Sequence, residues 1–154
     1  QNQITVISSI KPGYFNLLKL KIVLHLIHCV AKHFENKGSL GGITSIHFAR
    51  WCIIDNGRYL LFESNYDGSW DSYIGDFSDK VAWGLDLIWT NHPGYPKGGA
   101  ADIQPFKDII RRNQVRTQVF YSAYPDLTIQ NRINDREIAR TLRRDRVQKL
   151  LRRL

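Results

Sequence analysis

The 154-residue sequence contains no methionine and only two cysteines, Cys29 and Cys52. Two thiols are too few for a disulfide scaffold or for a zinc site with four thiolate ligands. Both cysteines lie inside apolar runs, so we expect buried free thiols. Because methionine is missing even from position 1, we expect an excerpt of a longer chain or a processed form.

Motifs that mark several common activities are also missing. No GxxxxGK[ST], GxGxxG, HExxH, GxSxG or CxxC occurs in the sequence, so none of these nucleotide-binding, hydrolase, metalloprotease or redox patterns assigns a function. Apolar residues make up 43% of the chain, charged residues 23% and aromatic residues 12%. This composition is ordinary for one globular domain.

The positive charge is concentrated at the C-terminal end. The chain has a formal net charge of +8, and residues 128–154 carry 9 basic and 3 acidic side chains, against 13 and 11 in residues 1–127. We therefore expect a domain over residues 1–127 and a basic helix or extension over residues 128–154. A basic patch of this kind attracts an anionic partner, although it is also typical of a solvated helix. The patch residues are Arg143, Arg144, Arg146, Lys149, Arg152 and Arg153.

One strongly apolar segment, residues 14–34, is predicted to be a helix. Lys21, His25, His28 and Lys32 recur at helical spacing and fall on one narrow stripe. We expect a helix that is buried on most of its surface and exposes one edge to solvent, rather than a membrane span or a signal peptide. The expected location is thus cytoplasmic or membrane-peripheral, and an interfacial membrane helix stays an alternative. His25 and His28 alone make a weak metal site, so no metal is expected.

The remaining pattern predicts alternating strands and helices. Strands are expected over residues 4–11, 45–55, 59–66 and 116–124, and helices over residues 69–91, from Pro105 and over residues 135–154 with Asn134 as the cap. Asn56 and Gly57 separate two apolar runs and predict a hairpin. The order βαββαβ predicts an α+β, ferredoxin-like antiparallel sheet with two covering helices and an appended basic C-terminal helix.

Both faces of the two hairpin strands are apolar. In the first strand we expect Ile46, Phe48, Cys52 and Ile54 on one side, with Ala49, Trp51 and Ile53 on the other. Because two apolar faces need two covers, the sheet is expected to pack against a second sheet. That sheet comes from a second copy or from another domain of the same polypeptide.

The polar residues in these strands allow a structural or a chemical role. Arg50 and Glu63 are predicted to form a partly buried ion pair. His47 is predicted to be a core or interface histidine whose hydrogen-bonding needs are satisfied. Arg50, Asp67 and His47 are nevertheless the candidate catalytic residues. The segment from Ser64 to Trp70 leads into a helix N-terminus, where an anion can bind. The favoured interpretation is that Asp67 or Ser69 caps the helix and Gly68 supplies the turn. The candidate binding residues are Asn65, Asp67, Gly68, Ser69, Tyr121 and Tyr124.

Three strings of the sequence resemble a poorly characterised bacterial family of large proteins: IHFARWCIID (46–55), YLLFESNYDGSWDSYIGDF (59–77) and QVFYSAYPDLTI (118–129). The layout also resembles the ferredoxin-like dimeric α+β barrel superfamily, which includes the dye-decolorising peroxidases. Those peroxidases carry a Gly-x-x-Asp-Gly element, of which Asp67 and Gly68 match and Ser64 replaces the first glycine. This resemblance implies haem as a cofactor.

These observations lead to one expected function and two alternatives. We expect an interaction or assembly module of a larger protein. The first alternative is a haem-dependent, peroxidase-like or small-molecule redox enzyme, and the second is binding to anionic membranes through residues 14–34 and the basic end. RNA binding by the sheet is disfavoured, because the third strand lacks the expected glycine and puts Glu63 where a base would approach. Sequence-specific nucleic acid binding is therefore not expected.

Overall fold

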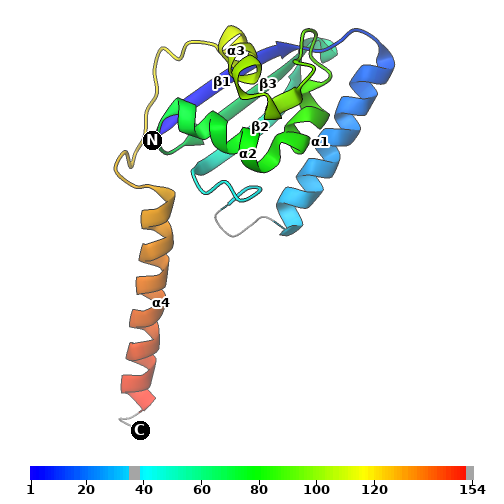
Figure 1. The fold of residues 1–154 in the computed structure, drawn as a ribbon. Coiled ribbons are helices and arrows are strands. Elements are labelled where there is room, and N and C mark those ends of the chain that lie inside the picture. Colours follow the sequence, from blue (N-terminus) through cyan, green and yellow to red (C-terminus); the bar gives the residue numbers. More distant parts are fainter. Residues whose placement is uncertain (35–38, 152–154) are drawn as a thin grey trace.

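The computed structural model describes residues 1–34 and 39–151, with the side chains of residue 34 and residues 145–151 left out. It is an α+β fold built on a three-stranded antiparallel sheet (Figure 1). The strands are β1 (Asn2–Ser9), β2 (Ile46–Ile54) and β3 (Tyr59–Tyr66), and the order across the sheet is β1-β3-β2.

The helices α1 (Tyr14–Phe34), α2 (Trp70–Trp89) and α3 (Ile103–Asn113) form a layer on one side of this sheet, and α4 (Ile129–Leu151) extends away from the domain (Figure 1). Two short 3-10 turns, η1 (Asp55–Gly57) and η2 (Gly99–Ala101), complete the described elements. The domain thus has two layers, a sheet and a helical cover, and the sheet has one face turned away from the helices.

The core lies between the sheet and α2. Phe62 of β3 packs edge-to-face against Phe77 and Trp89, and Tyr66 stacks on Tyr73 with ring centroids 3.9 Å apart. The helix predicted over residues 69–91 is confirmed, and it turns one apolar side toward the sheet. Its buried members are Tyr73, Ile74, Phe77, Leu85 and Ile88, and Trp70 and Val81 are partly buried.

The predicted hairpin is confirmed. Asp55, Asn56 and Gly57 all have positive φ angles, of 53°, 51° and 88°. Asparagine and glycine tolerate this left-handed conformation better than most residues, which is why they mark the turn in the sequence. Arg58 closes the turn through an ion pair with Asp55 at 2.6 Å.

The fourth strand, predicted over residues 116–124, does not form among the described residues. The chain bridges the free edge of β1 only where Gln114 pairs with Val6, and the Val115 N–H donates to the Thr5 carbonyl at 2.9 Å. The side chains of residues 115–121 are all exposed. Without a buried face, this segment gains too little from burial to be held as a strand, despite its β-branched and aromatic residues. The sheet therefore has three strands.

The prediction that α1 is buried on most of its surface is wrong. Leu20 and Val23 are buried and Leu17, Leu24 and Ile27 pack against the core, but much of the opposite side is apolar and exposed. The reason is the position of α1 at the margin of the helical layer, where only one side meets the domain (Figure 1). We call its exposed apolar residues the outer stripe: Phe15, Leu18, Ile22, Leu26 and Val30.

Two other boundaries differ from the prediction. Helix α4 begins at Ile129, and not near Asn134, because the Thr128 hydroxyl accepts the Asn131 N–H at 3.1 Å and caps it. In β2 the register shifts between Ile46 and Phe48. This bulge turns Ile46 toward the core, away from the side that it was expected to share with Phe48.

Candidate functional site

The sheet face that points away from the helices is the first candidate site, and we call it the open face. Its residues form four rows across β1, β3 and β2. The rows are Ser9–Tyr59–Ile54, Ile7–Leu61–Cys52, Thr5–Glu63–Arg50 and Gln3–Asn65–Phe48. The first two rows are mainly apolar and adjoin the hairpin. The other two are mainly polar, so the expectation of a wholly apolar second face holds for only half of it.

The predicted pair of Arg50 and Glu63 is confirmed at the centre of the open face. The guanidinium and the carboxylate form an ion pair, with the Arg50 Nε donating to Glu63 Oε2 at 2.5 Å. The expected partial burial holds for Glu63, whose side chain is 30% exposed, but not for Arg50, whose side chain is 65% exposed. The row Thr5–Glu63–Arg50, in the polar half of the open face, therefore carries one ion pair in which the two charges neutralise each other.

A shallow cavity of about 440 Å³ lies over the polar half of the open face. Gln3, Thr5, Glu63 and Asn65 form its floor, and residues 115–120 form its wall. Thr117 is hydrogen-bonded to Gln3 across the cavity margin. Asn65, a predicted binding residue, therefore lines a real cavity, and its neighbours are mostly polar.

The second candidate site is the place where β2, β3 and the start of α4 meet, which we call the Asp67 junction. The His47 Nε2 lies 2.8 Å from Asp67 Oδ1, and only 3% of the histidine side chain is exposed. The other carboxylate oxygen, Oδ2, accepts the Ile129 N–H at 2.9 Å. His47 is thus a satisfied core histidine, as predicted, and its carboxylate partner also anchors α4.

The start of the chain reinforces this junction. The Asn2 amide donates to the Gly68 carbonyl at 2.7 Å, and the Gln1 amide donates to the Leu127 carbonyl at 3.0 Å. The Ser122 hydroxyl donates to the Gln1 side chain at 2.9 Å. These bonds hold residues 122–129 against β1, at the side of the domain from which α4 departs.

At the start of α2 the capping interpretation is confirmed. The Ser69 hydroxyl accepts the Ser72 N–H at 3.1 Å, and Gly68 supplies the turn with φ of 85°. Ser64, which replaces a glycine of the peroxidase element, donates from its buried hydroxyl to the Phe48 carbonyl at 2.8 Å. The hydroxyl lies 2.5 Å from the Tyr73 hydroxyl, which is then the donor. The serine therefore joins β2, β3 and α2.

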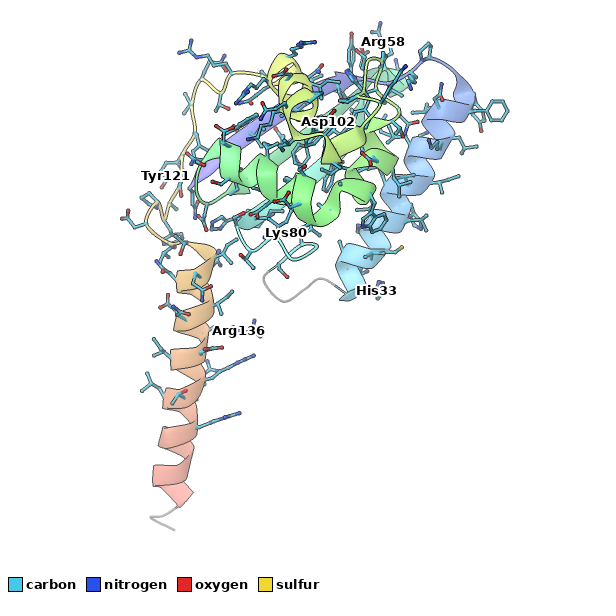
Figure 2. The ribbon with its side chains drawn as sticks, viewed as in Figure 1. His33, Arg58, Lys80, Asp102, Tyr121 and Arg136 are labelled. Atoms are coloured by element: carbon cyan, nitrogen blue, oxygen red, sulfur yellow. The ribbon has the colours of Figure 1, made fainter. Side chains whose placement is uncertain are left out.

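The remaining predicted binding residues lie on the surface. Tyr121 and Tyr124 lie in the segment between α3 and α4, and both are largely exposed. Figure 2 shows Tyr121 at the edge of the domain. In the basic patch, Arg143 and Arg144 are exposed on α4. The side chains of Arg146 and Lys149, as well as residues Arg152 and Arg153, lie outside the described part of the chain.

The three candidate catalytic residues are not arranged for haem chemistry. Arg50 pairs with Glu63 on the open face, whereas Asp67 is occupied by His47 and Ile129. Among the described residues, no histidine lines the cavity over the open face, so none of them offers an axial ligand there. The residues present do not fit the group that the resemblance implies, and no step through haem follows.

A metal site is not formed within the described residues, since no three histidine, cysteine or acidic side chains cluster there. The His25 Nε2 lies 3.8 Å from the Cys29 sulfur on α1. The free thiols Cys29 and Cys52 are half-buried, and not fully buried as expected.

Sequence reasoning missed one further polar centre, around Asp86 of α2. The Asp86 Oδ1 accepts the Tyr95 hydroxyl at 2.6 Å and the Ala100 N–H at 2.8 Å. Burial, followed by this hydrogen bond, raises the pKa of Tyr95 above its usual range. The Pro/Gly-rich loop that follows α2 could have suggested a need for such an anchor, but nothing in the sequence identifies Asp86 as that anchor.

In comparisons with known proteins, no family model, curated protein or solved structure matches this chain. The assignment of a function therefore depends on the geometry described above.

Proposed function

We propose that the chain is a ferredoxin-like assembly module whose open face packs against the open face of a second copy. The observation that carries the proposal is the apolar half of that face, formed by Ile7, Cys52, Ile54, Tyr59 and Leu61. An antiparallel sheet that faces water on one side normally alternates apolar and polar residues. Here two successive rows near the hairpin are mainly apolar on both sides of the sheet.

The arrangement of the helices supports this proposal. α1, α2 and α3 pack on the other side of the sheet, and α4 leaves the domain (Figure 1). None of these described helices covers the apolar half, and the cavity wall of residues 115–120 lies over the polar half. Two such faces packed together at the usual spacing of about 10 Å bury both apolar halves.

The isolated bridge between Val6 and Gln114 supports the ferredoxin-like topology in this proposal. It lies on the free edge of β1, where the fourth strand of that topology pairs. In the dimer, residues 116–124 gain a neighbour on the open face and extend this bridge into a strand. The charged row with Arg50 and Glu63 fixes the register between the two sheets, since unlike charges must meet across the interface.

The oligomeric state of the 154-residue chain tests the proposal. Size-exclusion chromatography with light scattering at micromolar concentration is expected to give twice the mass of the chain. The double variant Ile54→Glu/Tyr59→Glu puts two charges into one apolar row, and we expect it to weaken the dimer at least about tenfold. A folded wild-type chain that stays monomeric overturns the proposal.

A matched control distinguishes the open face from other apolar surface. Trp83 and Leu87 are exposed apolar residues four positions apart on α2. The double variant Trp83→Glu/Leu87→Glu carries the same added charge and is expected to remain dimeric. Loss of the dimer in this control as well would contradict a specific role for the open face.

A further inference from the structure

Helix α1 has an apolar surface that the fold leaves uncovered. Within its outer stripe, 83% of Phe15, 52% of Ile22 and 59% of Leu26 is exposed. The stripe residues follow one another at intervals of three or four positions, so they share one side of the helix, opposite the side that holds Leu20. Contiguous exposed apolar surface of this kind marks an interaction site.

The charges on α1 indicate what kind of surface it contacts. Residues 14–34 contain no acidic residue. Lys21, His25 and His28 lie along one edge of the outer stripe together with Lys32, and Lys19 lies near its other edge. All of these basic side chains are exposed. An apolar stripe with cationic margins complements an anionic lipid surface, where the lysine stems reach up to the headgroups.

The N-terminal end of α1 adds a second indication. Tyr14 and Phe15 are both largely exposed and their rings pack edge-to-face with centroids 6.1 Å apart. Aromatic side chains are enriched at the boundary between headgroups and acyl chains. Figure 2 shows the side chains of α1 projecting away from the domain along its length, with His33 at its other end.

From these observations we infer that α1 binds an anionic bilayer in the plane of the interface, with its outer stripe inserted and its basic residues at the headgroups. By length and composition α1 is the one described helix that could cross a membrane. Spanning would surround the helix with lipid and would require Leu20, Val23 and their neighbours to leave the core. The interfacial position keeps that packing.

Pairing of α1 with a second copy fits the pattern less well. A heptad repeat that starts at Phe15 places Leu18 and Ile22 at core positions, but it also places His25 and Lys32 there. Basic side chains at these positions disfavour a helical dimer. Two basic margins would also repel one another. The inference is independent of the proposed dimerisation through the open face, which lies on the other side of the sheet.

Flotation of the 154-residue chain with vesicles tests the inference. The chain is expected to float with phosphatidylcholine vesicles that contain phosphatidylserine, and much less with phosphatidylcholine alone or at high salt. The variant Ile22→Glu/Leu26→Glu is expected to lower binding at least about tenfold, because it removes two inserted side chains. The variant Lys19→Gln/Lys21→Gln is expected to lower binding about fivefold per lysine.

The control Trp83→Glu/Leu87→Glu has the same spacing and charge change and is expected to float like the wild type. Absence of flotation, equal flotation with neutral vesicles, or equal loss in the control overturns the inference. Loss of the dimer in the Ile22→Glu/Leu26→Glu variant would also overturn it, because the outer stripe would then be a self-association surface. Circular dichroism verifies that each variant is folded. Flotation and the oligomeric state are measured separately, so failure of membrane binding is distinguishable from failure of the proposed dimer.

Discussion

The His47 imidazole and the Asp67 carboxylate form a nearly buried pair at 2.8 Å, although 20 positions separate them in the chain. The same carboxylate accepts the Ile129 N–H at 2.9 Å, so one side chain satisfies both a buried histidine and an orphan amide at the start of α4. Asp67 thus anchors the start of α4, alongside the bonds that Gln1 makes to Leu127 and Ser122.

Replacement of Asp67 by alanine is expected to destabilise the domain by about 1–3 kcal/mol, because His47 is left without its partner in a buried position. The Ile129 amide also loses its acceptor and should exchange with solvent faster. Urea unfolding followed by circular dichroism measures the first effect, and amide hydrogen exchange measures the second.

Asp126→Ala is the control for Asp67→Ala, since Asp126 is a nearby exposed acid. It removes the same charge and is expected to change stability little. If both variants lose the same stability, general charge accounts for the effect and the anchoring role of Asp67 is wrong.

The Asp86 centre can be tested with two glycines in the loop after α2. Gly99 and Gly94 both have positive φ, of 68° and 80°. A Cβ on Gly99 would lie 2.7 Å from the Asp86 carboxylate oxygens, whereas a Cβ on Gly94 meets nothing within 4 Å. Gly94→Ala is therefore expected to cost about 1–2 kcal/mol from backbone strain alone, and Gly99→Ala clearly more.

Thermal unfolding of the two variants and of Asp86→Ala measures these costs. In the double variant Gly99→Ala/Asp86→Ala, the effects should be less than additive, because the clash with the carboxylate is already gone. Equal costs for Gly94→Ala and Gly99→Ala would show that Asp86 does not hold the loop closely.

Local sequence patterns predict the helices and strands better than they predict which apolar surfaces stay exposed. The hairpin and the buried face of α2 were predictable because turn chemistry and helical periodicity are encoded in neighbouring residues. The exposure of the outer stripe was not, because periodicity shows that a side of a helix is apolar and not whether anything covers it. The fourth strand failed for the same reason, since β propensity counts only where a partner strand and a buried face exist.

The candidate site was predictable where residues pair directly across a hairpin. Arg50 and Glu63 are register partners, so the hairpin alone brings them together. The pair of His47 and Asp67 depends on the bulge after Ile46, and the bond to Ile129 depends on how the chain returns after α3. Neither feature has a signal in the sequence.

Two buried tyrosines, Tyr66 and Tyr73, and the half-buried Tyr95 predict instability at high pH. Burial raises the pKa of Tyr66, Tyr73 and Tyr95 above the usual value of about 10. Above that value the unfolded chain loses phenolic protons that the folded chain keeps, so stability is full below about pH 10 and falls as the pH rises further. The limiting slope is about 1.4 kcal/mol per pH unit for each tyrosine.

Urea unfolding at about pH 8 and about pH 11 is expected to show this loss. The variant Tyr73→Phe is less stable at the lower pH, because it removes the bond to Ser64, but it should lose less between the two values. Titration of tyrosinate absorbance in the folded protein checks the cause. Ordinary titration of all seven tyrosines near pH 10 would contradict the prediction.

At low pH the corresponding test concerns Asp71, at the start of α2. Its Oδ1 accepts the Lys107 ammonium at 2.8 Å and the Arg111 guanidinium at 3.3 Å. The Lys107 hydrogen bond is the main cause that lowers the pKa of this carboxyl below its usual value. Because the folded state stabilises the charged carboxylate, the ion pair adds to stability at pH values above the pKa of aspartate in the unfolded chain. This stabilisation is lost as the pH falls through the lowered pKa of Asp71 in the folded chain.

The Asp71 carboxyl is exposed, so solvent screens this interaction and its effect on stability is small. The sensitive readout is instead the carboxyl chemical shift in an NMR titration. Lys107→Met is expected to move the Asp71 midpoint up toward the usual value, and Arg112→Met, which removes an exposed charge of α3, is expected to leave it in place. If the Asp71 titration midpoint stays unchanged in Lys107→Met, this ion pair does not hold the contact between α2 and α3.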